Sequence, residues 1–263
     1  MFRIICFGLA AVCLTSPLVA QQADEAGDFG SSTNTGSALI GIFYDLKQSQ
    51  KRQPVNADYM RSIAEFIDGG WDENLLSRFF RVTKPLYASD VFIPDISAGD
   101  APKAYHVDDI VRPRHWIVVY KGQVSPPEDG TYRFVAYADD VIAVGVNGKT
   151  NVVAYWAGWH GYTKWRESEP GPGGLLKNGD WFECRKDQII DLDILIGEYP
   201  GSRFGAWLFI EKKGASYSWG DSQKAGKVPM LPVFQVAPRA ISSSEGRYPF
   251  PFTTDSAPWK CYQ

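Results

Sequence analysis

This sequence lacks a dominant charge of either sign. Its 263 residues include 27 Lys and Arg and 30 Asp and Glu, which gives a formal net charge of -3. Positive and negative residues are interspersed along the chain. Proteins that bind nucleic acid or an anionic membrane surface usually gather basic residues into a field or a cluster. We therefore expect neither nucleic acid nor an anionic membrane as a partner.

Recognisable catalytic motifs are also missing. The sequence contains no HExxH zinc motif, no GxSxG nucleophile elbow and no cysteine nucleophile with a matching histidine. The three histidines, His106, His115 and His160, are scattered, and each is interpreted as an ordinary polar residue rather than a ligand or a base. The sequence therefore predicts a protein that is not an enzyme.

Long hydrophobic runs are confined to the N-terminus. Arg3 precedes an apolar core from Ile4 to Leu14, and Ser16 to Ala20 leads into polar sequence, which is typical of a secretory signal peptide over residues 1–20. No later apolar run approaches the roughly 18 residues of a membrane-spanning helix. We expect no transmembrane segment, and a secreted, periplasmic or cell-surface location.

Cysteines are few, and removal of the signal peptide leaves only Cys184 and Cys261. An oxidising compartment favours a disulfide between them. Such a bond closes a loop of about 77 residues, which the chain-entropy model values at roughly 4 to 5 kcal/mol. Two unpaired thiols are the alternative interpretation.

The sequence is rich in aromatic residues, at 14% with nine Trp, which fits an all-β or sugar-binding protein. The stretch over residues 116–151 is organised as strands and turns. A turn-forming segment follows Val118 and Tyr120, and Tyr132 and Phe134 then restore a period of two. The stretch closes on Asn147-Gly148, a strong type I′ hairpin signal. It predicts a β-meander.

The same stretch carries a set of spaced motifs: Gly122, the run Gly130-Thr131-Tyr132-Arg133-Phe134, Asp139-Asp140 and Asn147-Gly148-Lys149. In this order it resembles the protective-antigen-fourteen domain family, found in bacterial glycosidases and yeast adhesins. The resemblance covers roughly residues 38–213 and implies an all-β sandwich or barrel. In enzymes that carry such a domain, it implies a non-catalytic accessory role.

Asp139 and Asp140 form the sharpest candidate site. Adjacent side chains on a regular strand point to opposite faces, so the two carboxylates need a local distortion to share an ion. In the calcium-dependent adhesins of the family, a cis peptide bond joins the matching pair, and the resemblance implies calcium here as the one cofactor. The loop over residues 198–204 lacks the Asn that those adhesins present, and Arg203 adds a cation. The alternative is that the pair orders turns by accepting backbone N–H bonds.

An aromatic segment supplies the second candidate. Flat Trp faces stack on sugar rings, and their polar edges bond to hydroxyl groups. Trp156, Trp159 and Trp165 are the expected platform, with polar companions His160, Arg166 and Arg203. Packing of these aromatic rings in the core is the competing interpretation.

The remaining segments divide the chain further. Residues 21–37 are polar and predict a flexible leader, and residues 214–263 predict an extended tail packed on the domain. Residues 56–81 change to a helical period, with Asn56 as cap and Gly69-Gly70 as stop, and predict a short helical insert. The insert either packs on the sheet or exposes an apolar face to a protein partner.

These observations predict a secreted, non-catalytic carbohydrate-binding or surface-adhesion module, with a glycan or cell-surface polysaccharide as partner. The alternative is a structural or assembly subunit at the cell surface, acting through self-association or a protein interface. A divergent glycoside hydrolase is the least favoured reading, because adjacent Asp residues poorly match the roughly 5 to 9.5 Å separation of catalytic carboxyl groups.

Overall fold

The meander predicted over residues 116–151 is divided between two sheets in the computed structural model, which describes residues 27–34, 36–155, 168–239, 241 and 248–262. Strands β5 (Trp116–Ser125), β7 (Val141–Val146) and β8 (Lys149–Tyr155) belong to one sheet, whereas β6 (Gly130–Asp139) belongs to the other. The single-sheet meander is therefore wrong. Both strands pair instead with strands far along the chain, β5 with residues 190–198 and β6 with residues 203–212.

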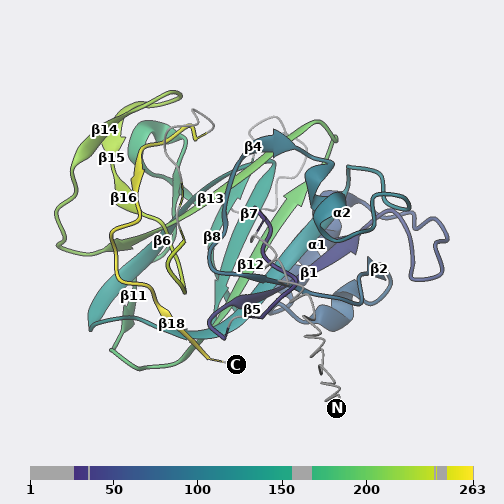
Figure 1. Cartoon of the computed structure of the whole chain (residues 1–263), viewed down its shortest axis with the longest axis horizontal. Helices are drawn as coiled ribbons and strands as arrows, with labels where there is room; N and C mark the ends of the chain where they lie inside the picture. The colour runs from purple at the N-terminus through teal and green to yellow at the C-terminus, as the bar shows by residue number, and fades with distance from the viewer. Residues whose placement is uncertain (1–26, 35, 156–167, 240, 242–247, 263) are drawn as a thin grey trace, which may run out of the picture.

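The protein is an all-β sandwich of two antiparallel sheets, as predicted (Figure 1). The eight-stranded sheet also contains β1 (Leu39–Asp45), β2 (Phe80–Arg81), β3 (Leu86–Ala88), β12 (Ile190–Glu198) and β18 (Lys260–Tyr262). The six-stranded sheet also contains β4 (Phe92–Ser97), β9 (Glu169–Pro170), β10 (Lys177–Asn178), β11 (Phe182–Cys184) and β13 (Arg203–Lys212).

Shorter elements complete the fold. They are the helices α1 (Tyr59–Asp68), η1 (Glu73–Leu76), α2 (Asp100–Ala104) and η2 (Pro172–Gly174), the pair β14 (Trp219–Ser222) and β15 (Gly226–Pro229), and the pair β16 (Leu231–Pro232) and β17 (Phe252–Thr253). The hairpin signal between β7 and β8 is confirmed. Asn147 and Gly148 have φ of 50° and 73°, the two positive values that a type I′ turn requires.

The main core lies between the sheets, where alternating side chains of both inner faces meet. Trp116 of β5 and Phe204 of β13 are fully buried there, with ring centroids 4.9 Å apart. Phe29, which precedes the first strand, packs 6.2 Å from the Trp116 ring. The Tyr120 hydroxyl donates to the Phe29 carbonyl at 3.1 Å. The described part of the leader therefore helps to close the sandwich.

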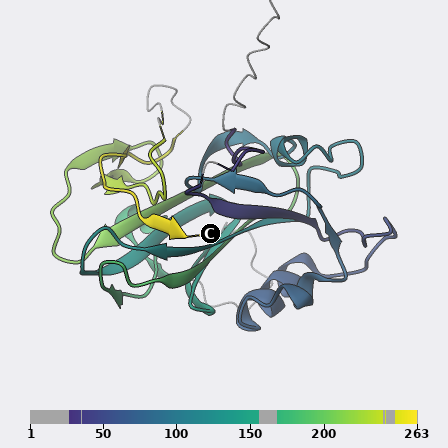
Figure 2. The same cartoon turned by 60° about the horizontal axis from the view of Figure 1, so that its bottom comes forward.

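Both outer faces of the sandwich are covered as well (Figure 2). Ile63 and Phe66 of α1 pack on the outer face of the eight-stranded sheet, against residues such as Leu195. On the six-stranded sheet, Trp207 is covered by Phe250 and other apolar side chains of the C-terminal region. The apolar face of α1 is therefore used within the molecule.

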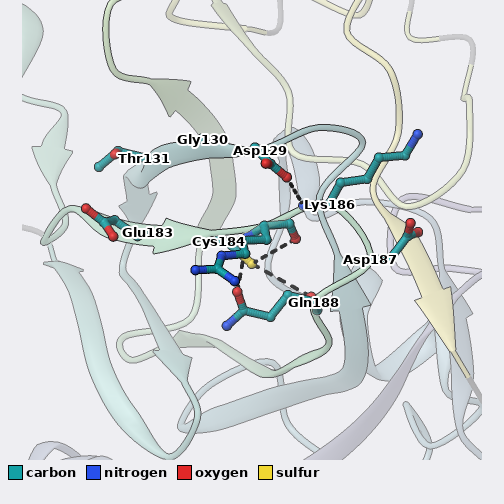
Figure 3. Close-up of a pocket in the computed structure, with 9 residues that line it drawn as sticks. Asp129, Gly130, Thr131, Glu183, Cys184, Lys186, Asp187 and Gln188 are labelled. Atoms are coloured by element: carbon teal, nitrogen blue, oxygen red, sulfur yellow. Dashed lines mark hydrogen bonds between the residues drawn. The ribbon is translucent and has the colours of Figure 1, made fainter.

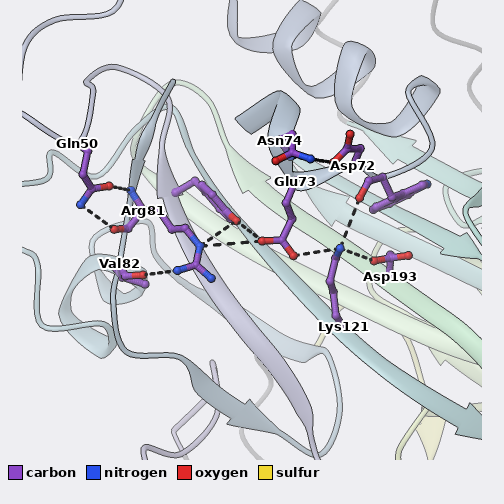
Figure 4. A network of polar contacts seen from close by, with 10 residues as sticks. Gln50, Asp72, Glu73, Asn74, Arg81, Val82, Lys121 and Asp193 are labelled. Carbon is purple, nitrogen blue, oxygen red and sulfur yellow. Dashed lines mark hydrogen bonds and ion pairs between the residues drawn. The ribbon is translucent and has the colours of Figure 1, made fainter. Parts of the chain in front are cut away.

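A polar network fixes the insert to the sheet (Figure 4). Glu73 of η1 accepts a hydrogen bond from the Tyr44 hydroxyl at 2.8 Å and pairs with the Lys121 ammonium at 3.1 Å. Lys121 also lies 3.4 Å from Asp193. Tyr44 and Lys121 stand on β1 and β5, so the Glu73 carboxylate ties the insert to two strands, and Lys121 extends the network to Asp193 on β12.

Helix α1 begins two residues later than the sequence predicts. Asp58 is the N-cap, and its side chain accepts a hydrogen bond from the Arg61 N–H at 2.8 Å. The exposed Asn56 caps nothing, because the helix starts only at Tyr59. The stop signal at Gly69 is confirmed as the C-cap.

This cap assignment can be tested with a matched pair of variants. Replacing Asp58 by Ala should lower the free energy of unfolding by about 1 kcal/mol, because the Arg61 N–H loses its acceptor. Asn56→Ala, the control, should leave it unchanged. Urea unfolding followed by circular dichroism measures both, and equal losses in the two variants would contradict the assignment.

Candidate functional site

Two connections between the sheets meet at one corner of the sandwich. The first joins β6 to β7 at Asp139 and Asp140, whose peptide bond is cis, as the family resemblance implies. The second joins β12 to β13 through residues 199–202. Antiparallel pairing sets Asp139 opposite Gly205 and Val141 opposite Gly197, so Glu198 at the end of β12 is brought beside the aspartates.

Asp139, Asp140 and Glu198 form what we call the acidic corner. Asp140 is 2% exposed and Glu198 is fully buried. The Tyr199 N–H donates to Asp140 Oδ2 at 2.8 Å, and the Gly201 N–H donates to Glu198 Oε1 at 2.7 Å. Glu198 Oε2 is buried without a hydrogen-bond partner in the described part of the chain. Such an orphaned oxygen carries a desolvation cost.

The charges of the acidic corner are not balanced by the residues around it. Burial, together with repulsion from Asp139, raises the pKa of Asp140 to about 7. Burial and the neighbouring Asp140 raise the pKa of Glu198 to about 8. Within the described residues, no lysine, arginine or histidine pairs with these carboxylates. The corner therefore favours a bound proton or an added cation.

An aromatic surface adjoins the acidic corner. The Tyr199 ring stacks on His115 with centroids 4.7 Å apart and lies 5.5 Å from the Tyr59 ring of α1. Tyr199 remains 40% exposed, so one edge of this group faces solvent. Burial lowers the pKa of His115, and the nearby Lys47 and Arg114 charges lower it further, which favours a neutral imidazole in the stack.

Two residues of this site, Glu198 and Tyr199, are not predicted as site residues from the sequence. The sequence predicts Glu198 in a loop without an Asn or Asp, whereas the structure places it at the end of β12, where its carboxylate is an oxygen donor. Tyr199 is a single aromatic residue, and the Trp-rich segment carries the stronger signal for a sugar platform. The signal that was available is the order Glu-Tyr-Pro-Gly at the turn between two long strands.

The other predicted site residues lie elsewhere. Arg203 pairs with Asp95 of β4, with Nε to Oδ1 at 2.7 Å, so its charge is directed to the neighbouring strand. Its second guanidinium contact is the Asp95 carbonyl at 2.7 Å. Five predicted residues lie outside the described part of the chain: Trp156, Trp159, His160, Trp165 and Arg166. Tyr155, just before them, pairs with Val141, directly after Asp140.

The predicted disulfide is not formed, and both cysteines are free and buried. Cys184 lies opposite Gly130 in one sheet, whereas Cys261 lies opposite Val124 in the other. Each thiol donates to a main-chain carbonyl, Cys184 to that of Gln188 at 3.7 Å and Cys261 to that of Ala38 at 3.3 Å. Their separation along the chain gave no information about this placement.

Cys184 also borders an open cavity of about 920 Å³ (Figure 3). Two of its lining residues are joined by a hydrogen bond, in which the main-chain N–H of Lys186 donates to the Asp129 carboxylate at 2.7 Å. Burial raises the pKa of the Cys184 thiol, which disfavours a reactive thiolate. The described residues of this cavity therefore suggest no nucleophile.

No three His, Cys, Asp or Glu side chains of the described residues are already spaced as a metal-ligand group. A cation at the acidic corner would therefore need oxygen ligands beyond the side chains of Asp139, Asp140 and Glu198, such as main-chain carbonyls and water.

Among the described residues, no helix is long and apolar enough to cross a membrane.

Comparison with known proteins adds structural neighbours. No protein-family model matches the chain, and no curated protein matches it. Solved structures similar to it include protective-antigen-fourteen (PA14) domains. The PA14 sugar-binding domain from an RTX adhesin is 16% identical, covers 70% of this chain and 94% of its own, and gives a TM-score of 0.42. The PA14 domain of the MpAFP antifreeze protein is 14% identical, with 73% and 90% covered and a TM-score of 0.42.

A third similar structure is the A domain of epithelial adhesin 9 from Candida glabrata, solved in complex with Galb1-4GlcNAc. It is 12% identical, covers 71% of this chain and 88% of its own, and has a TM-score of 0.40. Because these identities and TM-scores are low, the fold of this chain is assigned from its own strands and sheets, as described above.

The unbalanced charges predict an unusual dependence of stability on pH in the absence of metal. A carboxyl group whose pKa is higher in the folded state stabilises the fold at low pH, and this contribution is lost as pH rises through the folded-state value. We expect metal-free protein to lose stability between about pH 5 and pH 8, the range that ends at the raised values of Asp140 and Glu198.

The variant Glu198→Gln should flatten this dependence, because an amide carries no charge and can donate to Asp140. At pH 8 it should be more stable than wild type by at least about 1.4 kcal/mol, the equivalent of one pKa unit. Chemical unfolding from pH 5 to 8 with a chelator present measures the slopes. Parallel profiles for wild type and variant would contradict the charge imbalance.

Proposed function

We propose that the acidic corner binds calcium and that the protein is a non-catalytic carbohydrate-binding or adhesion module whose ligand site includes this ion. The observation that carries the proposal is the burial of Asp140 and Glu198 without a cation from the described chain. Isolated buried charges are costly, and proteins neutralise or coordinate them. A divalent cation would remove the repulsion that raises both pKa values.

The chemistry of the donors favours calcium over other metals. Carboxylate and carbonyl oxygens are hard ligands, and Ca²⁺ accepts about 6 to 8 of them in a flexible geometry. The acidic corner stands where two connections leave the sheets, so main-chain carbonyls and solvent are available beside the three carboxylates. Softer metals would require the thiol or imidazole ligands that the corner does not supply.

The neighbouring surface supports a sugar ligand. Tyr199 presents an exposed aromatic edge next to the corner and is held in place by His115. An aromatic face can stack on a sugar ring while the calcium ion accepts its hydroxyl groups as ligands. The Trp-rich segment begins after Tyr155, whose strand pairs with the one that follows Asp140. The proposed location is extracellular or at the cell surface.

The alternative of an assembly subunit acting through the helical insert has less support. Ile63 and Phe66 are buried against the sheet. Leu75 is the exposed large apolar side chain of the insert among the described residues. A single such residue does not form a docking surface.

Calcium binding should be visible as thermal stabilisation at neutral pH. At a calcium concentration of 100 times Kd, the folded state gains about 2.7 kcal/mol. For a domain of this size, that corresponds to roughly 5 to 10 °C in melting temperature. Asp140→Asn should abolish the shift, whereas Asp221→Asn, an exposed acid on β14, should retain it. A wild-type melting temperature that is the same in calcium and in chelator would refute the ion site.

Sugar binding should depend on both the ion and Tyr199. On a glycan array, we expect wild-type binding that a chelator removes. Tyr199→Ala should weaken it by about two- to tenfold, the range that corresponds to an aromatic contact of 0.5 to 1.5 kcal/mol. Trp219→Ala is the control, because Trp219 is 65% exposed on β14, outside the site. Absence of binding to plant, algal and host glycans would remove the sugar assignment.

A further inference from the structure

A basic surface lies beside the loop that completes the acidic corner. It surrounds a cavity of about 270 Å³ whose lining includes Lys47, Arg52, Arg112 and Arg114. Asp45 is the one acidic residue among its described lining residues. For a protein with a net charge of -3, this is a local reversal of sign. We call these four cations the basic rim.

The single acid is already neutralised. Asp45 is 1% exposed, and its Oδ1 lies 2.5 Å from the Lys47 ammonium, so these two charges cancel. Arg52, Arg112 and Arg114 are exposed, and their guanidinium groups form no ion pair with the described residues. The basic rim therefore presents three uncompensated positive charges to solvent.

The main chain that carries two of these arginines is held in place. The Lys47 ammonium donates to the Arg112 carbonyl at 3.3 Å and to the Arg114 carbonyl. Gln48 Nε2 donates to the Ile110 carbonyl at 3.1 Å and to Asp45 Oδ2 at 2.9 Å. Fixing this segment in advance lowers the entropy cost of binding a ligand there.

The basic rim is continuous with the candidate calcium site. Gly201, whose N–H bonds to Glu198, has φ of 90° and packs so closely that a Cβ there would meet the Pro113 carbonyl at 2.7 Å and the Arg114 Cβ at 2.9 Å. The residue after Arg114 is His115, which stacks on Tyr199. The chain therefore passes from the rim to the aromatic surface without a break.

We propose that the protein selects an acidic polysaccharide, whose sulfate or carboxylate groups bind the basic rim while a neighbouring sugar of the same polymer occupies the site at Tyr199 and the ion. The inference rests on the proposed function and adds the class of glycan. Guanidinium groups suit these oxyanions because they offer two parallel N–H donors. A polymer with repeated negative charges can reach both surfaces at once.

Dextran sulfate and unmodified dextran provide the test, with binding measured by isothermal titration calorimetry in calcium and in chelator. We expect wild-type protein to bind dextran sulfate and to bind dextran at least tenfold more weakly. The triple variant Arg52→Gln, Arg112→Gln, Arg114→Gln should lose about tenfold or more in affinity for dextran sulfate and show a smaller salt dependence, because fewer counterions are released. The triple variant Lys186→Gln, Lys213→Gln, Lys227→Gln removes the same charge elsewhere and should bind as wild type does.

The outcomes separate the two proposals. Equal losses in both triple variants, or equal binding of dextran and dextran sulfate, would overturn the basic rim as a selective site. Binding to phosphatidylserine vesicles that needs the rim, without binding to dextran sulfate, would overturn the polysaccharide in favour of a lipid. Rim-dependent binding of dextran sulfate that is unchanged by chelator would support the rim and count against the calcium-dependent function. A calcium-induced rise in melting temperature without rim-dependent binding of dextran sulfate would support the calcium site and count against the basic rim.

Discussion

Strand β12 is the constraint on which the arrangement of the site depends. It pairs with β5 from Ile190 to Glu198 and with β7 from Leu192 to Gly197, so both of its edges are used. Its side chains alternate between the core of the sandwich and the layer under α1, with Ile194 facing one and Leu195 the other. With both edges and both faces occupied, the register of β12 is fixed, and the position of Glu198 follows from it.

The sequence predicts what is determined locally. The Asn147-Gly148 turn follows from the backbone angles that those residues tolerate, and the helical period of the insert follows from burial on one face. The division of β5 and β6 between two sheets could not be predicted from the same stretch, because their partners β12 and β13 begin at Ile190 and Arg203. Cys184 and Cys261 failed as a predicted pair for the same reason. Distant pairing decides on which sheet each cysteine stands.

The candidate site shows the same division between local and distant information. Asp139 and Asp140 are adjacent in sequence and were identified from their spacing relative to other motifs. Glu198 joins them only because Gly197 pairs with Val141, a contact across more than fifty positions of the chain. The raised pKa values then arise from burial of these groups together. A sequence pattern along one strand carries no information about which distant strand will pair with it.

The helical insert and the acidic corner share one residue, Tyr59. It stands at the first turn of α1, and its hydroxyl donates to the Trp116 carbonyl at 3.0 Å, opposite Glu198 in the β5–β12 pair. Gly197 makes room for it, because a Cβ at that position would collide with the hydroxyl. Burial, followed by the charges of Asp140 and Glu198, raises the pKa of Tyr59 well above its ordinary value, so the hydroxyl stays a donor. Tyr59 therefore connects the insert to the end of β12, where Glu198 of the acidic corner lies.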